Sequence, residues 1–186
     1  MKNELIIFDF FGVICSEIAP YVFENHFDKQ TAAKLKQDLF VPADLGQTTM
    51  DEVFDKMARI INIPMDELKK EWNSYVIIDS EVVDYIKRLR NDYSVALLSN
   101  APLGVVEELL DRFGLNELFD NKVISSVVKL AKPNTKVYEL CVSAFNKKFD
   151  KIYMIDDNPA NLNPLDGLGI TPIHFTSIAD LKKVFG

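Results

Sequence analysis

The stretch "LIIFDFFGVICS", residues Leu5 to Ser16, places a single carboxylate, Asp9, in an otherwise apolar run. From Leu5 to Phe10 there is no regular alternation of polar and apolar side chains, which predicts a strand buried on both faces, as in a parallel sheet. A carboxylate at such a place is unfavourable unless another group compensates its charge. Asp9 therefore needs a partner, but two residues further on the chain carries the aromatic ring of Phe11 instead of a second acid.

Four later stretches resemble this first strand, and helical patterns separate them. The stretches are Ser94–Ser99, Lys122–Ser126, Lys151–Ile155 and Ile170–Phe175. Two clear helical patterns cover residues 103–113 and 134–146. Strands that alternate with helices in this way predict an α/β fold with a doubly wound parallel sheet.

Residues 16–93 depart from the alternation, because they contain helical patterns alone. Thr49 and Glu52, for example, form a capping-box pattern before an apolar stripe of helical spacing. We therefore expect an all-helical cap at residues 16–93, inserted into an α/β core formed by residues 1–15 and 94–186. The last helix of the insert is equally compatible with the core.

The composition narrows the class of protein. Of the 186 residues, 48% are hydrophobic, which is enough to bury a substantial core. The net charge of −7 and the absence of a basic stripe argue against nucleic acid as a partner. Cys15 and Cys141 have neither zinc-site spacing nor a disulfide framework, which suits a reducing, cytoplasmic location. No apolar segment is long enough to predict a signal peptide or a membrane span.

Polar side chains follow the first four predicted strands at their carboxyl ends. In chain order these are Asp9, then Ser99 and Asn100, then Lys129 and Lys132, and finally Asp156 and Asp157. In open α/β sheets, ligands bind beyond the carboxyl ends of the strands. Acids alone would repel one another there, whereas acids with a divalent cation, a lysine and a hydroxyl could hold a phosphate.

Four segments of the chain resemble the haloacid dehalogenase (HAD) superfamily. They read "FDFFGVI", "LLSNAP", "KLAKPNTKVYE" and "MIDDNPANL", in order and each at a predicted strand end. The helical insert lies between the first two, and its stretch "ADLGQTTMDEVFDKM" is similar to a sequence common in the caps of this group. The resemblance implies a HAD-like core with a helical cap and a hydrolase, most often a Mg²⁺-dependent phosphatase that acts on a small phosphorylated substrate.

For the phosphate, the resemblance implies a role for four residues. Asp9 would be the nucleophile and would form an aspartyl-phosphate. Lys132 would neutralise charge on the nucleophile and on the transferred group. Ser99 would bind a phosphate oxygen together with the backbone N–H of Asn100.

The resemblance also implies a metal site and a phosphate-binding turn. Mg²⁺ would be bound by Asp9, by Asp157 and by the backbone C=O of Phe11, with Asp156 reaching it directly or through water. The turn at Phe10 and Phe11 would offer backbone N–H groups to the phosphate. Because a backbone C=O serves with any side chain, an aromatic residue at position 11 leaves the metal site intact.

Phe11 nevertheless departs from the phosphatase pattern. Phosphatases of the superfamily usually carry an Asp there, which protonates the leaving oxygen and then activates water, although some phosphatase-like members carry Gly. Such acid–base help contributes roughly 10²–10⁴-fold, so we expect slow or specialised turnover.

Two alternatives to a phosphatase stay open. Haloacid dehalogenases resemble this chain in having an aromatic residue at position 11, and they need no metal. They differ in their fourth motif, where this chain carries Asp157 in place of a serine and Asn161 in place of an acid. Without a cation the acids at the strand ends would be uncompensated, so the charge balance favours a phosphatase. The other alternative is a non-catalytic protein that binds metal and phosphate.

Overall fold

The centre of the molecule is a five-stranded parallel sheet with β1 in the middle. The computed structural model describes residues 3–186. Its strands are β1 (Glu4–Phe8), β2 (Ser94–Ser99), β3 (Asn121–Ile124), β4 (Lys151–Asp156) and β5 (Ile170–His174). They are arranged in the order β3-β2-β1-β4-β5, and every neighbouring pair is parallel. The α/β fold with a doubly wound parallel sheet is therefore confirmed.

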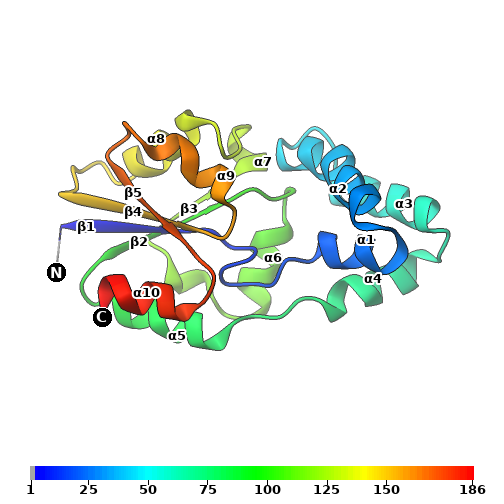
Figure 1. Cartoon of the computed structure of the whole chain (residues 1–186), viewed down its shortest axis with the longest axis horizontal. Coiled ribbons are helices and arrows are strands. Elements are labelled where there is room, and N and C mark those ends of the chain that lie inside the picture. The colour runs from blue at the N-terminus through cyan, green and yellow to red at the C-terminus, as the bar shows by residue number, and fades with distance from the viewer. Residues whose placement is uncertain (1–2) are drawn as a thin grey trace.

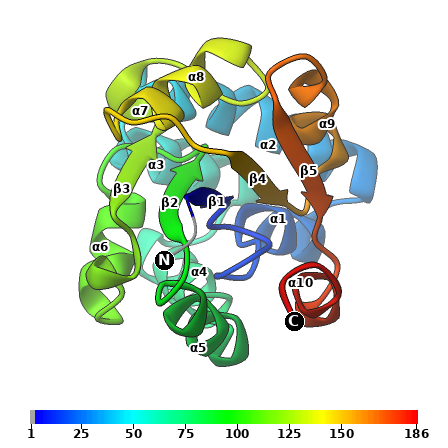
Figure 2. The ribbon, with the colours of Figure 1, turned by 90° about the vertical axis from the view of Figure 1, so that its left-hand side faces the viewer.

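Ten α-helices are present in residues 3–186. They are α1 (Ala19–His26), α2 (Lys29–Asp44), α3 (Met50–Ile61), α4 (Met65–Ser74), α5 (Ser80–Leu89), α6 (Val105–Arg112), α7 (Ser125–Val128), α8 (Thr135–Ser143), α9 (Pro159–Leu162) and α10 (Ile178–Phe185). Two 3₁₀-helices, η1 (Asn116–Leu118) and η2 (Asn163–Leu165), complete the elements. Figures 1 and 2 show α8 and α9 on one side of the sheet and α5 and α10 on the other.

Alternate residues of the strands face two separate cores, because successive side chains of a strand point to opposite faces. Leu5 and Ile7 of β1 pack with buried residues of α8 and α9. Ile6 and Phe8 belong to the other core, which includes buried residues of α5, α6 and α10. The strand has no polar face, and this explains the continuous apolar run in the sequence.

Strand β1 ends at Phe8, two residues before the end of the apolar run. The backbone N–H of Asp9 still donates to the C=O of Ile155 at 2.9 Å. Beyond it the chain turns, and the C=O of Phe10 accepts from the N–H groups of Ile14 and Cys15 at 2.8 and 2.9 Å. The Phe10 side chain is fully buried. The apolar run in the sequence therefore continues past the end of the strand.

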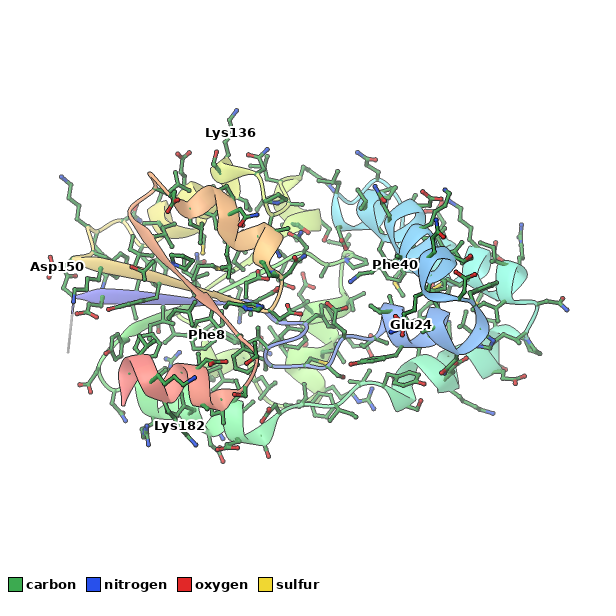
Figure 3. All side chains as sticks on the ribbon, viewed as in Figure 1. Phe8, Glu24, Phe40, Lys136, Asp150 and Lys182 are labelled. Atoms are coloured by element: carbon green, nitrogen blue, oxygen red, sulfur yellow. The ribbon has the colours of Figure 1, made fainter. Side chains whose placement is uncertain are left out.

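Helices α1–α4, here called the four-helix group, lie beyond the carboxyl ends of the strands (Figure 1). The predicted capping box of Thr49 and Glu52 is present at the start of α3. Inside the group the Phe40 and Trp72 rings stack with centroids 5.7 Å apart. In Figure 3, Phe40 lies on the side of the four-helix group and Phe8 on the side of the sheet, with side chains filling the region between them.

Helix α5 follows the four-helix group in sequence but packs beside α10. Tyr85 donates its hydroxyl to the C=O of Leu181 at 3.3 Å, and Lys182 pairs with Glu81 at 2.7 Å. Within the part of the chain that the structure describes, no helix is long and apolar enough to cross a membrane.

Candidate active site

Lys132 joins two of the acids at the strand ends. Its Nζ lies 2.7 Å from Oδ2 of Asp9, just after β1, and 2.6 Å from Oδ2 of Asp156, at the end of β4. The Lys132 side chain is completely buried. Burial by itself would lower the pKa of Lys132, but the two carboxylates outweigh it and raise that pKa above its usual value. The lysine is thus a fixed positive charge between two acids.

Asn100 holds the backbone of Lys132 in place. Its amide Nδ2 donates to the C=O of Lys132 at 2.8 Å, and its Oδ1 accepts from the N–H of Lys132 at 2.8 Å. This pair of bonds ties the end of β2 to the loop after α7. The sequence indicated Asn100 for its backbone N–H, so the clamp made by its side chain was missed.

Asp156 is saturated with hydrogen bonds. Its Oδ1 accepts from the N–H of Asn158 at 2.9 Å and from Nδ2 of Asn161 at 3.0 Å, while Oδ2 accepts from Lys132. Asn161 is fixed in turn by Tyr138, whose hydroxyl donates to its C=O at 2.6 Å. Every oxygen of Asp156 therefore has a protein partner, and Asn161 is a supporting residue that the sequence did not reveal.

Asp157 is in a different position, because among residues 3–186 its carboxylate is hydrogen-bonded to its own backbone N–H alone. It packs directly against Gly12, where a Cβ would lie 2.3 Å from the Asp157 carboxyl carbon. Gly12 also has a φ of 76°, which other residues rarely adopt. Burial raises the pKa of Asp157 to about 6, with further contributions from Glu17 and Asp156.

Three carboxylates meet at this point. Ligand atoms of Asp9, Asp156 and Asp157 all lie within 4.8 Å of one another. Burial raises the pKa of Asp9 well above its usual value. Lys132 lowers this pKa, whereas Asp156 and Asp157 raise it further. One lysine cannot balance three carboxylates, and oxygen-rich sites of this kind suit a hard divalent cation. The residues therefore fit a metal ion.

The backbone turn after β1 contributes an N–H group to the site. The N–H of Phe10 donates to Oδ1 of Asp9 at 2.7 Å, which fixes the orientation of that carboxylate. The Phe10 side chain is buried, whereas Phe11 is half-buried and lines a cavity. The two rings pack edge to face with centroids 5.1 Å apart.

Ser99 lies at the end of β2 and is fully buried. Within residues 3–186 its hydroxyl has no hydrogen-bond partner. A buried hydroxyl without a hydrogen-bond partner is unusual and destabilises the folded state. It is a polar group for which the described protein atoms supply no acceptor.

A cavity of about 320 Å³ separates the strand ends from the four-helix group. Asp9, Phe11, Asn100, Lys132 and Asp157 line it from the side of the sheet. From the opposite side it is lined by Glu17 and by residues of the four-helix group, which include Lys36, Phe40, Asp44 and Trp72. The sequence allowed the aromatic residues of this segment, Trp72 among them, to line a substrate pocket, but it suggested no role for Glu17, Lys36 or Asp44. The spacing of four between Lys36, Phe40 and Asp44 places them on one helix face, but only the fold shows what that face meets.

Comparisons with known proteins agree with this arrangement. The family model "haloacid dehalogenase-like hydrolase" matches residues 4–165. A search of the curated proteins found no match. Among solved structures, the HAD family enzyme bt-2542 of Bacteroides thetaiotaomicron, in complex with magnesium and inorganic phosphate, has a TM-score of 0.79 at 20% identity, over 98% of this chain and 99% of that chain.

Two further structures share the fold. A predicted HAD-like family hydrolase from Porphyromonas gingivalis has a TM-score of 0.73 at 24% identity, over 97% of each chain. L-2-haloacid dehalogenase from Xanthobacter autotrophicus has a TM-score of 0.66 at 15% identity, over 98% of this chain and 82% of that chain. The family model covers most of the sequence, and the site residues described above lie within it. This chain belongs to the haloacid dehalogenase-like hydrolases.

Proposed function

We propose that this hydrolase is a Mg²⁺-dependent phosphatase that acts on a small phosphorylated substrate. The observation that carries the proposal is the charge arrangement at the strand ends. Lys132 is shared by Asp9 and Asp156, and Asp157 stands within reach of both, hydrogen-bonded among residues 3–186 to its own backbone N–H alone. A divalent cation balances this excess of negative charge and leaves the site ready for a phosphate anion.

For the metal, we assign Asp9 and Asp157 as direct ligands together with the backbone C=O of Phe11. Asp156 is assigned an indirect role, because both of its oxygens already accept hydrogen bonds. It would orient Lys132 and hold a metal-bound water. When bound, Mg²⁺ would supply positive charge to the oxygens of the phosphate.

For the reaction, Asp9 is assigned as the nucleophile, since its carboxylate is held by the N–H of Phe10 and by Lys132. The Asp9 oxygen attacks phosphorus and forms an aspartyl-phosphate, which water then hydrolyses. Lys132 neutralises charge on the transferred group. The unpartnered hydroxyl of Ser99 and the backbone N–H of Asn100 would bind its oxygens.

The four-helix group is assigned the role of a cap. We assign α1–α4 to the cap and α5 to the sheet, because α5 is held by α10 through hydrogen bonds and an ion pair. A cavity of about 320 Å³ between cap and sheet suits a small metabolite. Closure around such a substrate would exclude bulk water from the acyl-phosphate intermediate.

The magnesium and phosphate complex of bt-2542 supports the proposal. It demonstrates that a protein with this fold holds both groups. The decisive experiment measures phosphate release from a panel of phosphorylated metabolites, with Mg²⁺ and with EDTA. We expect release that depends on Mg²⁺ and is lost in Asp9→Asn, while Asp38→Asn on the outer surface of α2 remains active.

The same assay separates the alternatives. Halide release from 2-haloacids without metal would contradict the phosphatase proposal and favour a dehalogenase. Binding of Mg²⁺ and phosphate, measured by calorimetry, without turnover of any substrate would instead favour a binding protein.

A further inference from the structure

The site lacks a proton donor next to the nucleophile, because Phe11 offers only a ring. We infer that Asp44, at the end of α2, is the general acid and base of this enzyme, supplied by the four-helix group from across the cavity. The inference rests on the proposed phosphatase function and assigns a catalytic role to a residue of the cap-like stretch "ADLGQTTMDEVFDKM", away from the strand ends.

Asp44 stands on the side of the cavity where the leaving group departs. It lines the same cavity as Asp9 and Lys132, but it comes from α2 and they come from the strand ends. In phosphoryl transfer the attacking and leaving oxygens are roughly in line. A leaving oxygen in line with attack by Asp9 would point away from Asp9 and into the cavity that Asp44 also lines.

Of the two acids on this side of the cavity, Asp44 and Glu17, Asp44 is the one that is free to exchange a proton. Glu17 lines the same cavity, but its Oε2 is paired with Nζ of Lys36 at 3.1 Å. The half-buried Asp44 carboxyl makes no hydrogen bond or ion pair within the described chain from residue 3 to residue 186. Its position gives it access to the cavity without fixing its proton elsewhere.

The charged groups around Asp44 set its protonation. Lys36 faces it from its own helix, Glu17 from the loop before α1, and Lys132 from the sheet side. Burial raises the pKa of Asp44 to about 7; Glu17 adds to the rise, and the two lysines oppose it. A carboxyl with that pKa can give a proton in one step and take it back in the next near neutral pH.

The end of α2 is held against the sheet side by a close backbone contact. Nζ of Lys129 donates to the C=O of Gly46 at 3.3 Å. At Gly46 a Cβ would lie 2.7 Å from the C=O of Ser126 and 2.1 Å from Nζ of Lys129. The contact lies two residues after Asp44 and therefore fixes the height of this carboxyl above the strand ends.

The proposed hydrolysis has two steps. In the first, an Asp9 oxygen bonds to phosphorus, the bond from phosphorus to the leaving oxygen breaks, and protonated Asp44 gives its proton to that oxygen, so an alcohol leaves. In the second, the Asp44 carboxylate takes a proton from water as the water oxygen attacks phosphorus. Inorganic phosphate leaves, Asp9 is regenerated as a carboxylate and Asp44 is protonated again.

The test compares Asp44→Asn with wild type on two kinds of substrate. An alkyl phosphate has a poor leaving group that needs a proton, whereas p-nitrophenyl phosphate has a good one that does not. In the first turnover we expect Asp44→Asn to slow the alkyl phosphate by about 10²–10⁴-fold and to leave the nitrophenol burst nearly unchanged. The steady state after that burst is expected to be slow, because water attack lacks its base.

The pH profile and a matched control complete the experiment. For the alkyl phosphate, first-turnover rates of wild type should fall as pH rises above about 7, and this limb should vanish in Asp44→Asn. Asp38→Asn makes the same change on an exposed part of the same helix and should match wild type. Thermal melting of both variants checks that they fold.

Two results would overturn the inference, one without and one with the proposed function. Equal losses on both substrates in the first turnover, or a rise in KM with kcat unchanged, would make Asp44 a binding residue while the phosphatase proposal stands. Absence of Mg²⁺-dependent phosphate release from wild type with every substrate would overturn the proposed function and this inference together.

Discussion

At the scale of single residues, the site separates charge from proton transfer. Asp9, Asp156 and Lys132 form a buried group in which each charge has a partner. Phe11 cannot move a proton, although its side chain lines the same cavity as Asp9. Asp44 stands apart from this group and has a pKa near neutrality. In the proposed mechanism, the acid–base function therefore lies on the helix opposite and not at the strand end.

An Asp at position 11 should restore what Asp44→Asn removes. We expect the double variant Asp44→Asn/Phe11→Asp to transfer phosphate from an alkyl phosphate at least tenfold faster in the first turnover than Asp44→Asn alone. A tenfold gain is a small part of what acid–base catalysis contributes. In wild type the gain should be smaller, because Asp44 already supplies the proton. Rapid-quench measurement of phosphate transfer checks both.

Phe11→Asn is the matched control, since it removes the ring and adds a polar group that cannot titrate. Equal recovery by Phe11→Asn and Phe11→Asp would show that space, and not a carboxyl, limits the reaction. No recovery by Phe11→Asp in a folded protein that still binds Mg²⁺ would count against the account of position 11.

At the scale of elements, the contact between the α2–α3 turn and α7 connects the four-helix group to the loop that carries Lys132. Gly46 has a φ of 63° and approaches the backbone of Ser126 so closely that no side chain fits. Lys129, which ends α7, adopts a φ of 60° and reaches back to Gly46. The loop of α7 continues directly into Lys132. One short segment therefore contacts the end of α2 and leads into Lys132.

Gly46→Ala should disturb this contact and lower activity. Gly114 offers a matched control, because its φ is 66° but no atom lies within 4 Å of its would-be Cβ. Each alanine adds left-handed backbone strain of about 1–2 kcal/mol. We expect Gly114→Ala to lose only that stability and to keep its kcat/KM, whereas Gly46→Ala loses more stability and also kcat/KM. Urea unfolding and phosphate release measure both; equal effects of the two variants would contradict a link between α7 and the cap.

At the scale of the whole molecule, the sequence predicts the layers better than it predicts their contacts. The apolar runs identify β1 and β2 most clearly because these strands are buried on both faces, whereas the edge strand β5 buries only Ile170 and Ile173. The acids at the strand ends could be found for the same reason, since parallel strands end at one edge. The contact of Asn161 with Asp156 and the place of Asp44 could not be predicted, because they depend on which side chains meet across loops and across the cavity. A helical spacing shows which residues share a face but not what that face contacts.

The excess negative charge at the strand ends couples metal binding to the stability of the whole fold. Mg²⁺ that binds only the folded chain should raise the free energy of unfolding by about 2.7 kcal/mol at a hundred times its Kd. In Asp157→Asn we expect a higher melting temperature than wild type without metal, because a half-buried carboxylate beside two other acids is gone. The same variant should lose most of the shift that Mg²⁺ produces in wild type. Differential scanning calorimetry with Mg²⁺ and with EDTA gives both values. A full Mg²⁺ shift in Asp157→Asn would place the cation elsewhere, while a lower melting temperature without metal would mean that Asp157 stabilises the fold in its own right.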